Sequence, residues 1–247
     1  MLPNIKEKYT EKSITDPMSY IEKYKEGIAF NGDVALIIYP YAASIFLNSA
    51  RQNNLKIKKD KKYIIVEDKI LCCISQISSP NVTISIEEMR IFNIRKLINI
   101  GIAGSINRDL NIGDIVLCEK AIRDEGSSYH YLKPSKYAYS SKKLLNYIEK
   151  KFTEFNIDFK KGGSWTIDAP YRETLKEVIK YSKSGILTVE MESSAVFAVT
   201  EYYKIQSGSI FVISDKIGEY GWEHKFNSKK INSSLTKIFN FIFDVFL

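Results

Sequence analysis

The chain has 247 residues, of which 45% are hydrophobic and 13% aromatic, and it carries a formal net charge of +7 at pH 7. This is enough apolar material for one large domain, while no apolar run approaches the roughly 18 residues that a membrane span needs. A basic surface would suit nucleic acid, but the lysines are scattered apart from a run over 56–62 and no aromatic RNA-binding motif accompanies them, so we expect a solvated lysine face.

The segment over 1–30 is predicted to be an N-terminal helical extension. It is charged and lacks the apolar core of a signal peptide, so we expect a cytoplasmic protein. Apolar runs predict strands at 34–40, 63–66, 69–75, 95–106, 112–123, 185–191 and 208–216. Helical patterns predict helices at 41–52, 79–94, 140–155, 192–204 and 228–246. This alternation is typical of an α/β fold with a central sheet covered by helices on both faces, and without a linker or repeat it predicts a single domain over 1–247.

The three cysteines predict neither a disulfide framework nor a zinc site. Cys72 and Cys73 are neighbours in one predicted strand, and Cys118 lies in another. None has the Cys-x-x-Cys or Cys/His spacing of a metal site, so we expect buried free thiols and no metal.

Polar residues follow several of the predicted strands, where α/β proteins place their sites. Four strand ends stand out, at 101–105, 123–131, 190–192 and 214–216. In TVEMESSAV, two acids flank a methionine where a buried strand passes into a helix. Acids in a first helical turn can simply complement the helix dipole, and this interpretation stays open beside a functional one.

Five segments, in this order and spacing, resemble the nucleoside phosphorylase family, which includes purine and uridine phosphorylases and related nucleosidases. They are INIGIAGSINRDLNIGDIVL, AIRDEGSSYHYLKPS, GGSWTIDAPYRET, VEMESSAVFAV and VISDK. The resemblance covers roughly residues 30–245 and implies a central mixed, partly barrel-like sheet flanked by helices. It also implies an enzyme that cleaves the N-glycosidic bond of a nucleoside, works without an organic cofactor and forms a homo-oligomer, either a dimer or a hexamer.

Cleavage of such a bond passes through a sugar with oxocarbenium character. The resemblance implies that Glu192 binds the 2′- and 3′-hydroxyls of the ribose, which a carboxylate can accept together, and that its charge stabilises the cationic ring. It also implies that Met191 packs against the sugar, with Glu190 in support. Asp215 is implied as the acid that protonates a purine leaving group, although a helix-capping or loop role is the alternative.

The resemblance places Asp168 and Tyr171 in the base site. Many members have an aromatic residue where this chain has Pro170, so Tyr171 or Trp165 is a candidate for the flat face against the base. His130 is a candidate lining residue without an assigned role.

Three further residues, Ala103, Gly104 and Ser214, are implied to line the substrate. The Ser-Asp pair at 214–215 favours a purine, and the Gln-Arg pair that reads uracil has no clear match. The segment RDEGSSYHY favours uridine instead.

The phosphate-binding pattern of the family is incomplete. Phosphate needs backbone N–H groups and arginines, and Ala42, Asn99 and Ile102 occupy the usual ligand positions, so its binding residues stay unassigned. Three functions remain open. They are a phosphorylase that uses inorganic phosphate at a rebuilt site with Lys58, Arg90 or Arg123, a hydrolytic nucleosidase, and a nucleoside-binding homologue without turnover.

Overall fold

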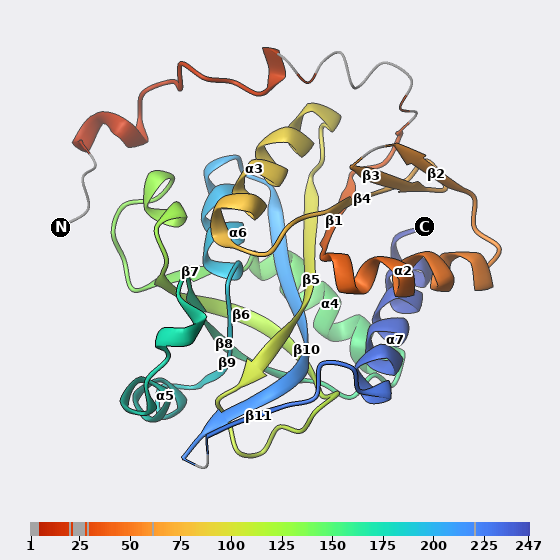
Figure 1. Cartoon of the computed structure of the whole chain (residues 1–247). Helices are drawn as coiled ribbons and strands as arrows, with labels where there is room; N and C mark the ends of the chain where they lie inside the picture. The colour runs from red at the N-terminus through yellow and green to blue at the C-terminus, as the bar shows by residue number, and fades with distance from the viewer. Residues whose placement is uncertain (1–4, 20, 22–27, 29, 61, 220) are drawn as a thin grey trace.

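The structure is a computed structural model that describes residues 5–19, 21, 28, 30–60, 62–219 and 221–247. Its strands are β1 (Val34–Ile38), β2 (Ile57–Asp60), β3 (Tyr63–Val66), β4 (Ile70–Ile74), β5 (Lys96–Ser105), β6 (Ile115–Asp124), β7 (Tyr137–Tyr139), β8 (Lys160–Ile167), β9 (Ile186–Glu190), β10 (Gln206–Gly218) and β11 (Gly221–His224). Its α-helices are α2 (Pro40–Gln52), α3 (Ser79–Met89), α4 (Lys142–Glu154), α5 (Leu175–Ser182), α6 (Ser193–Tyr202) and α7 (Lys229–Phe246). Figure 1 shows their arrangement.

The strands form one mixed sheet, part of which closes into a barrel. Strands β10, β6, β8, β9 and β5 pair in this order, and β5 also pairs with β10, which completes a ring of five. Outside this ring, strand β1 pairs with the first part of β5. Strands β4, β3 and β2 then follow in that order. The prediction of a mixed, partly barrel-like α/β sheet is therefore confirmed.

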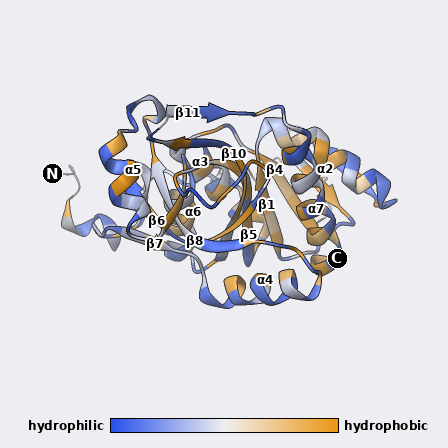
Figure 2. Cartoon of the chain, turned by 90° about the horizontal axis from the view of Figure 1, so that it is seen from below, coloured by the Kyte–Doolittle hydropathy of each residue, from blue (hydrophilic) through white to orange (hydrophobic). Residues whose placement is uncertain are grey.

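Helices cover both faces of the sheet, as the alternation of elements predicts. In β1, Ala35 and Ile37 pack into one apolar cluster, whereas Leu36 and Ile38 pack into another, because successive side chains of a strand point to opposite faces. Helices α3 and α6 contribute to the first cluster, and α2, α4 and α7 to the second. Figure 2 shows hydrophobic residues on the strands and inward helix faces and hydrophilic residues outside.

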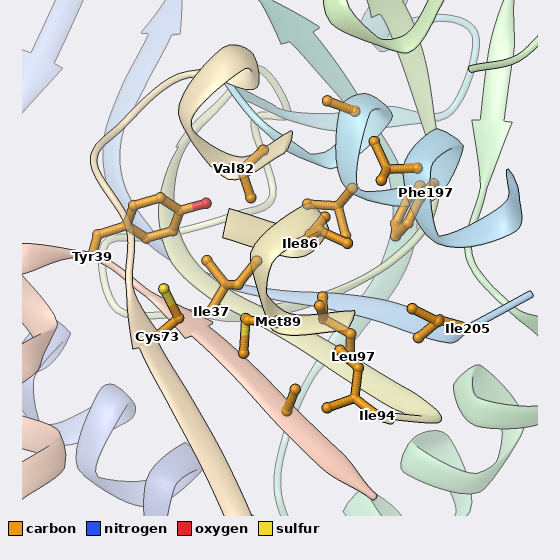
Figure 3. Packing of buried hydrophobic residues seen from close by; sticks show 14 of the residues in the cluster. Ile37, Tyr39, Cys73, Val82, Ile86, Met89, Ile94, Leu97, Phe197 and Ile205 are labelled. Carbon is orange, nitrogen blue, oxygen red and sulfur yellow. The ribbon is translucent and has the colours of Figure 1, made fainter. Parts of the chain in front are cut away.

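The packing of α3 corrects one detail of the predicted helix. Figure 3 shows Val82, Ile86 and Met89, spaced one helical turn apart, against Ile37 of β1. Ile84 of the same helix is 53% exposed, although it is apolar. The helix ends at Met89 and continues as the 3-10 helix η2 (Arg90–Phe92).

Several elements were not predicted, and β8 shows the reason. Its sequence KKGGSWTI contains two glycines, which are unfavourable in strands. A Cβ atom at Gly162 would lie 2.5 Å from the side chain of Leu187, and one at Gly163 would lie 2.5 Å from that of Ile186, so the glycines allow β9 to approach. β11, which contains His224, was also not predicted.

The predicted helical extension over 1–30 lies partly outside the described residues. In its described part, η1 (Lys6–Tyr9) is a 3-10 helix, and the Tyr9 hydroxyl donates to the carbonyl of Tyr129 at 3.1 Å. Across the described ranges, no helix has both the length and the apolar character to span a membrane. All three cysteines are buried and free, as predicted.

Candidate active site

A cavity of about 960 Å³ lies where three of the four predicted strand ends meet. Residues 102–104 of β5, residues 189–192 at the junction of β9 and α6, and Ser214, Asp215 and Ile217 of β10 line it. The remaining lining comes from the start of α2, from Ile77 between β4 and α3, from the segment before α5, from β11 and from the region around the start of α7. The fourth strand end, at 123–131, contributes nothing to the lining. Of the predicted site residues, the following line the cavity: Ala103, Gly104, Tyr171, Glu190, Met191, Glu192, Ser214 and Asp215.

The two acids of Glu-Met-Glu occupy different environments. Glu190 accepts hydrogen bonds from the backbone N–H groups of Glu192 (2.9 Å) and Ser193 (2.7 Å) and from the hydroxyls of Thr166 and Ser164. These bonds satisfy free N–H groups at the start of α6, so the helix-dipole interpretation accounts for Glu190. The hydrogen-bonding capacity of the Glu190 carboxylate is therefore used within the protein.

Glu192 has spare capacity to bind a ligand in the cavity. Its Oε1 accepts from the backbone N–H of Ser78 at 2.8 Å, and its Oε2 accepts weakly from that of Met191 at 3.2 Å. Ser78 adopts φ 124°, which side-chain-bearing residues rarely do, so its N–H is held toward Glu192 at a conformational cost. Burial and the neighbouring Glu190 raise the pKa of Glu192 to about 8.

Asp215 is placed at the cavity by an irregularity in β10. The register with β5 shifts between Ile213 and Asp215, so that Ser214 is an extra residue in the strand. The Ser214 hydroxyl donates to Asp215 Oδ1 at 2.6 Å, and Trp222 Nε1 donates to Oδ2 at 2.8 Å. Asp215 is only 7% exposed, so these two donors fix its carboxylate at the cavity wall.

Two tyrosines lie beside the three positions that the family resemblance assigns to phosphate, Ala42, Asn99 and Ile102. The Tyr39 hydroxyl donates to Asn99 Oδ1 at 2.8 Å, and the Tyr41 hydroxyl accepts from the backbone N–H of Ile102 at 2.6 Å. Their rings stack at 6.1 Å between centroids, and burial raises the pKa of both phenols, so they remain neutral. Ala42 and Asn99 are fully buried, and only Ile102 of the three usual phosphate positions reaches the cavity.

A family model of the phosphorylase superfamily matches residues 46–245. The chain belongs to the phosphorylase superfamily. This confirms the resemblance on which the expected fold was based.

Curated members of the superfamily match part of the chain. A DeoD-type purine nucleoside phosphorylase from Brevibacillus brevis is 29% identical over 140 residues, which is 56% of this chain and 60% of that protein. Its counterpart from Bacillus cytotoxicus is 26% identical over 142 residues, with the same coverage. The chain thus spans about three fifths of the length of the curated relatives it matches.

Solved structures of the superfamily share the fold over most of the chain. The 5′-methylthioadenosine/S-adenosyl homocysteine nucleosidase of Campylobacter jejuni has a TM-score of 0.71 and 20% identity, covering 87% of this chain and 98% of that chain. The purine nucleoside phosphorylase of Toxoplasma gondii, in complex with immucillin-H, has a TM-score of 0.73 and 17% identity, covering 86% and 90%.

Some residues implied by the superfamily pattern lie outside the cavity. Asp168, expected in the base site, is not in the lining, and its carboxylate accepts from the Gly126 N–H at 2.9 Å. Trp165 is a core residue, with no exposed surface and its Nε1 bonded to Asp124 at 2.9 Å. His130, in the 3-10 helix η3 (Ser127–His130), is also absent from the lining.

The structure adds cavity residues that the sequence did not single out as site residues. Glu173 follows the 3-10 helix η4 (Pro170–Arg172), and Trp222 lies on β11. Glu173 belongs to the GGSWTIDAPYRET segment, so its position beside the superfamily's base-site pattern was an available signal. Trp222 had no such signal, because only the hairpin turn brings it back onto Asp215.

The approach of Asp215 to β5 yields a first prediction. A Cβ atom at Gly104 would lie 2.9 Å from Asp215 Oδ2 and 3.0 Å from the Ile217 side chain. Gly104→Ala is therefore expected to displace the Asp215 carboxylate and reduce nucleoside cleavage, while circular dichroism shows a folded protein. Gly126→Ala is the control, because the nearest atom to its Cβ would lie at an ordinary 3.8 Å. Equal activity in both variants would contradict the assigned geometry.

The raised pKa of Glu192 yields a second prediction, on stability. Between the ordinary glutamate pKa of 4.5 and about 8, folded Glu192 holds a proton that the unfolded chain has lost. The free energy of unfolding should therefore fall as pH rises through this window, with a slope of at most about 1.4 kcal/mol per pH unit. Glu192→Gln should lose this slope. Urea titrations from about pH 5 to about pH 8.5 measure the free energy of unfolding of both proteins. An identical pH dependence in wild type and Glu192→Gln would refute the prediction.

Proposed function

We propose that this chain is an enzyme that hydrolyses the N-glycosidic bond of a nucleoside, with a purine nucleoside as the favoured substrate. The observation that carries the choice of water over phosphate is the lack of basic side chains among the described residues that line the cavity. Its charged lining residues are Glu173, Glu190, Glu192 and Asp215, and among the described residues no lysine, arginine or histidine lines it.

An inorganic phosphate dianion is a poor fit for this cavity. It would have carboxyl groups around it and no cationic side chain among the described lining residues to offset the cost of its desolvation. Its usual donors are backbone N–H groups and forked guanidinium groups. The backbone N–H of Ile102 in β5 already donates to the Tyr41 hydroxyl. Water, being neutral, meets neither obstacle.

The basic side chains considered for a rebuilt phosphate site are engaged elsewhere. Lys58 pairs with Asp68 at 2.8 Å, and Arg90 pairs with Glu87 at 2.8 Å. The guanidinium of Arg123 donates to Ser128, to Ser135 and to two backbone carbonyls. Moving any of them into the cavity would break these bonds, so a rebuilt phosphate site is disfavoured.

In the proposed reaction, the ribose lies against Met191 and Glu192. As the bond between C1′ and the base nitrogen breaks, its electron pair moves to the base and the ribose ring becomes cationic. The ionised form of Glu192, which is the minor form below its pKa of about 8, stabilises this cation, and Asp215 passes a proton to N7 of the purine. Water forms the new bond to C1′, and the proton that it loses balances the one that Asp215 gave.

The relatives support cleavage of a purine nucleoside over simple binding. Those named above are purine nucleoside phosphorylases and a nucleosidase that acts on adenosine derivatives. Glu192 and Asp215 supply the charge stabilisation and the proton that cleavage needs, whereas a binding protein needs no acid aimed at the base. The cytoplasmic location expected from the N-terminal segment and the homo-oligomeric state expected from the resemblance belong to this proposal as well.

Base release from adenosine, inosine and uridine tests the proposal. Binding can be followed separately through tryptophan fluorescence, because the chain has two tryptophans, of which Trp165 is buried and Trp222 lines the cavity. We expect binding and base release with a purine nucleoside, and slower release from uridine. Binding of all three without release of any base would contradict an enzymatic function.

A further inference from the structure

Glu173 is an acid of the cavity that the proposed reaction leaves unused. It lies between η4 and α5, on the same segment as Pro170 and Tyr171, and its side chain lines the cavity while being half-buried. The sequence Pro-Tyr-Arg-Glu over 170–173 therefore places a carboxyl group in the part of the cavity where the superfamily pattern places the base.

The Glu173 carboxyl lacks a hydrogen-bonding partner in the described part of the chain. Each of the other three acids accepts at least two hydrogen bonds, from backbone N–H groups, hydroxyls or an indole. No hydrogen bond or ion pair reaches the carboxyl of Glu173 from the residues that the structure describes. Because a partly desolvated carboxyl without a donor is costly, an unpaired one facing a cavity indicates a donor on the ligand.

The electrostatics associate Glu173 with Asp215. Both residues line the same cavity, and burial followed by the charge of Asp215 raises the pKa of Glu173 to about 7. Asp215 is the group proposed to reach N7 of the purine. The substituent nearest to N7 is the one on C6, which therefore lies next to both acids.

We propose that Glu173 reads the base and, with Asp215, selects a purine with an exocyclic amino group over one with an oxo group. This inference rests on the proposed function of the cavity. An amino group has two N–H donors, so it can serve two carboxyl groups at once. An oxo oxygen only accepts, so it offers no donor to the ionised form of Glu173.

The test compares kcat/KM for adenosine and inosine in wild type, Glu173→Gln and Glu177→Gln. Wild type should prefer adenosine. Glu173→Gln should lower the adenosine-to-inosine ratio by about 10- to 100-fold, because the glutamine amide can donate to an oxo group and the charge-assisted bond to the amino group is lost. Glu177 is the matched control, since it is a nearby acid of α5 that does not line the cavity. Its carboxylate accepts from the backbone N–H of Thr174 in the capping box of that helix.

Binding of the free bases separates this inference from the proposed function. Titration of adenine and hypoxanthine, followed by tryptophan fluorescence, needs no turnover. Wild type should bind adenine more tightly, and Glu173→Gln should remove the difference. If the bases are discriminated in this way but no nucleoside is cleaved, the proposed function fails and the role of Glu173 stands. A preference for hypoxanthine, or a preference for adenine unchanged in Glu173→Gln, overturns the inference.

Discussion

Asp215→Asn is expected to reduce the cleavage of purine nucleosides by about 10²-fold or more, because the asparagine amide cannot deliver a proton to the departing base. The substitution preserves the size of the side chain. It retains one acceptor for the donors at Ser214 and Trp222, so we expect a folded protein that still binds substrate. Steady-state kinetics with adenosine measure the loss.

Two controls distinguish lost acid catalysis from general damage. Asp158→Asn makes the same chemical change at an exposed position outside the cavity, and it should leave the rate unchanged. A riboside with a nitrophenolate leaving group departs without protonation, so Asp215→Asn should cleave it almost as well as wild type does. If Asp215→Asn reduces the cleavage rates of both substrates equally, Asp215 positions the substrate and does not act as the acid.

Glu192→Gln is expected to cost about 10²- to 10³-fold in kcat, comparable to removing one preorganised electrostatic group from an active site. The amide keeps an oxygen for the Ser78 N–H and for one ribose hydroxyl, but it lacks the negative charge that opposes the cationic sugar. The loss should therefore fall on kcat more than on KM. Glu201→Gln, at the far end of α6 and outside this cavity, is the matched control.

A substrate without the 2′-hydroxyl sharpens the assignment of Glu192. If the carboxylate accepts both ribose hydroxyls, a 2′-deoxynucleoside has already lost one of these bonds. Glu192→Gln should then slow the deoxynucleoside less than the ribonucleoside, and the two changes should not be additive. Full additivity of the two changes would show that Glu192 does not bind the 2′-hydroxyl of the ribose.

The sequence predicted the elements whose apolar period is strong, and β1 is an example. Val-Ala-Leu-Ile-Ile is buried on both sides, as a central parallel strand requires, and its position could be inferred without a partner. The predictions missed elements that depend on contacts with distant segments. β8 has its glycines because β9 lies close, and β11 forms by pairing with the end of β10.

The same distinction holds within the site. Glu192 and Asp215 belong to local patterns at strand ends, so the superfamily resemblance located both. The different environments of Glu190 and Glu192 were not predictable, because they depend on Thr166 of β8 and on the strained backbone of Ser78. Asp168 belongs to an equally good local pattern, yet its side chain bonds to the loop at Gly126.

The sugar product of the reaction tests the central claim, that this acid-lined cavity uses water as the nucleophile. Purified enzyme would be incubated with adenosine in phosphate-free buffer and in buffer with added inorganic phosphate, and the sugar identified by chromatography against ribose and ribose 1-phosphate. We predict free ribose, formed at the same rate in both buffers. Formation of ribose 1-phosphate, with a rate that rises with phosphate concentration, would contradict the account.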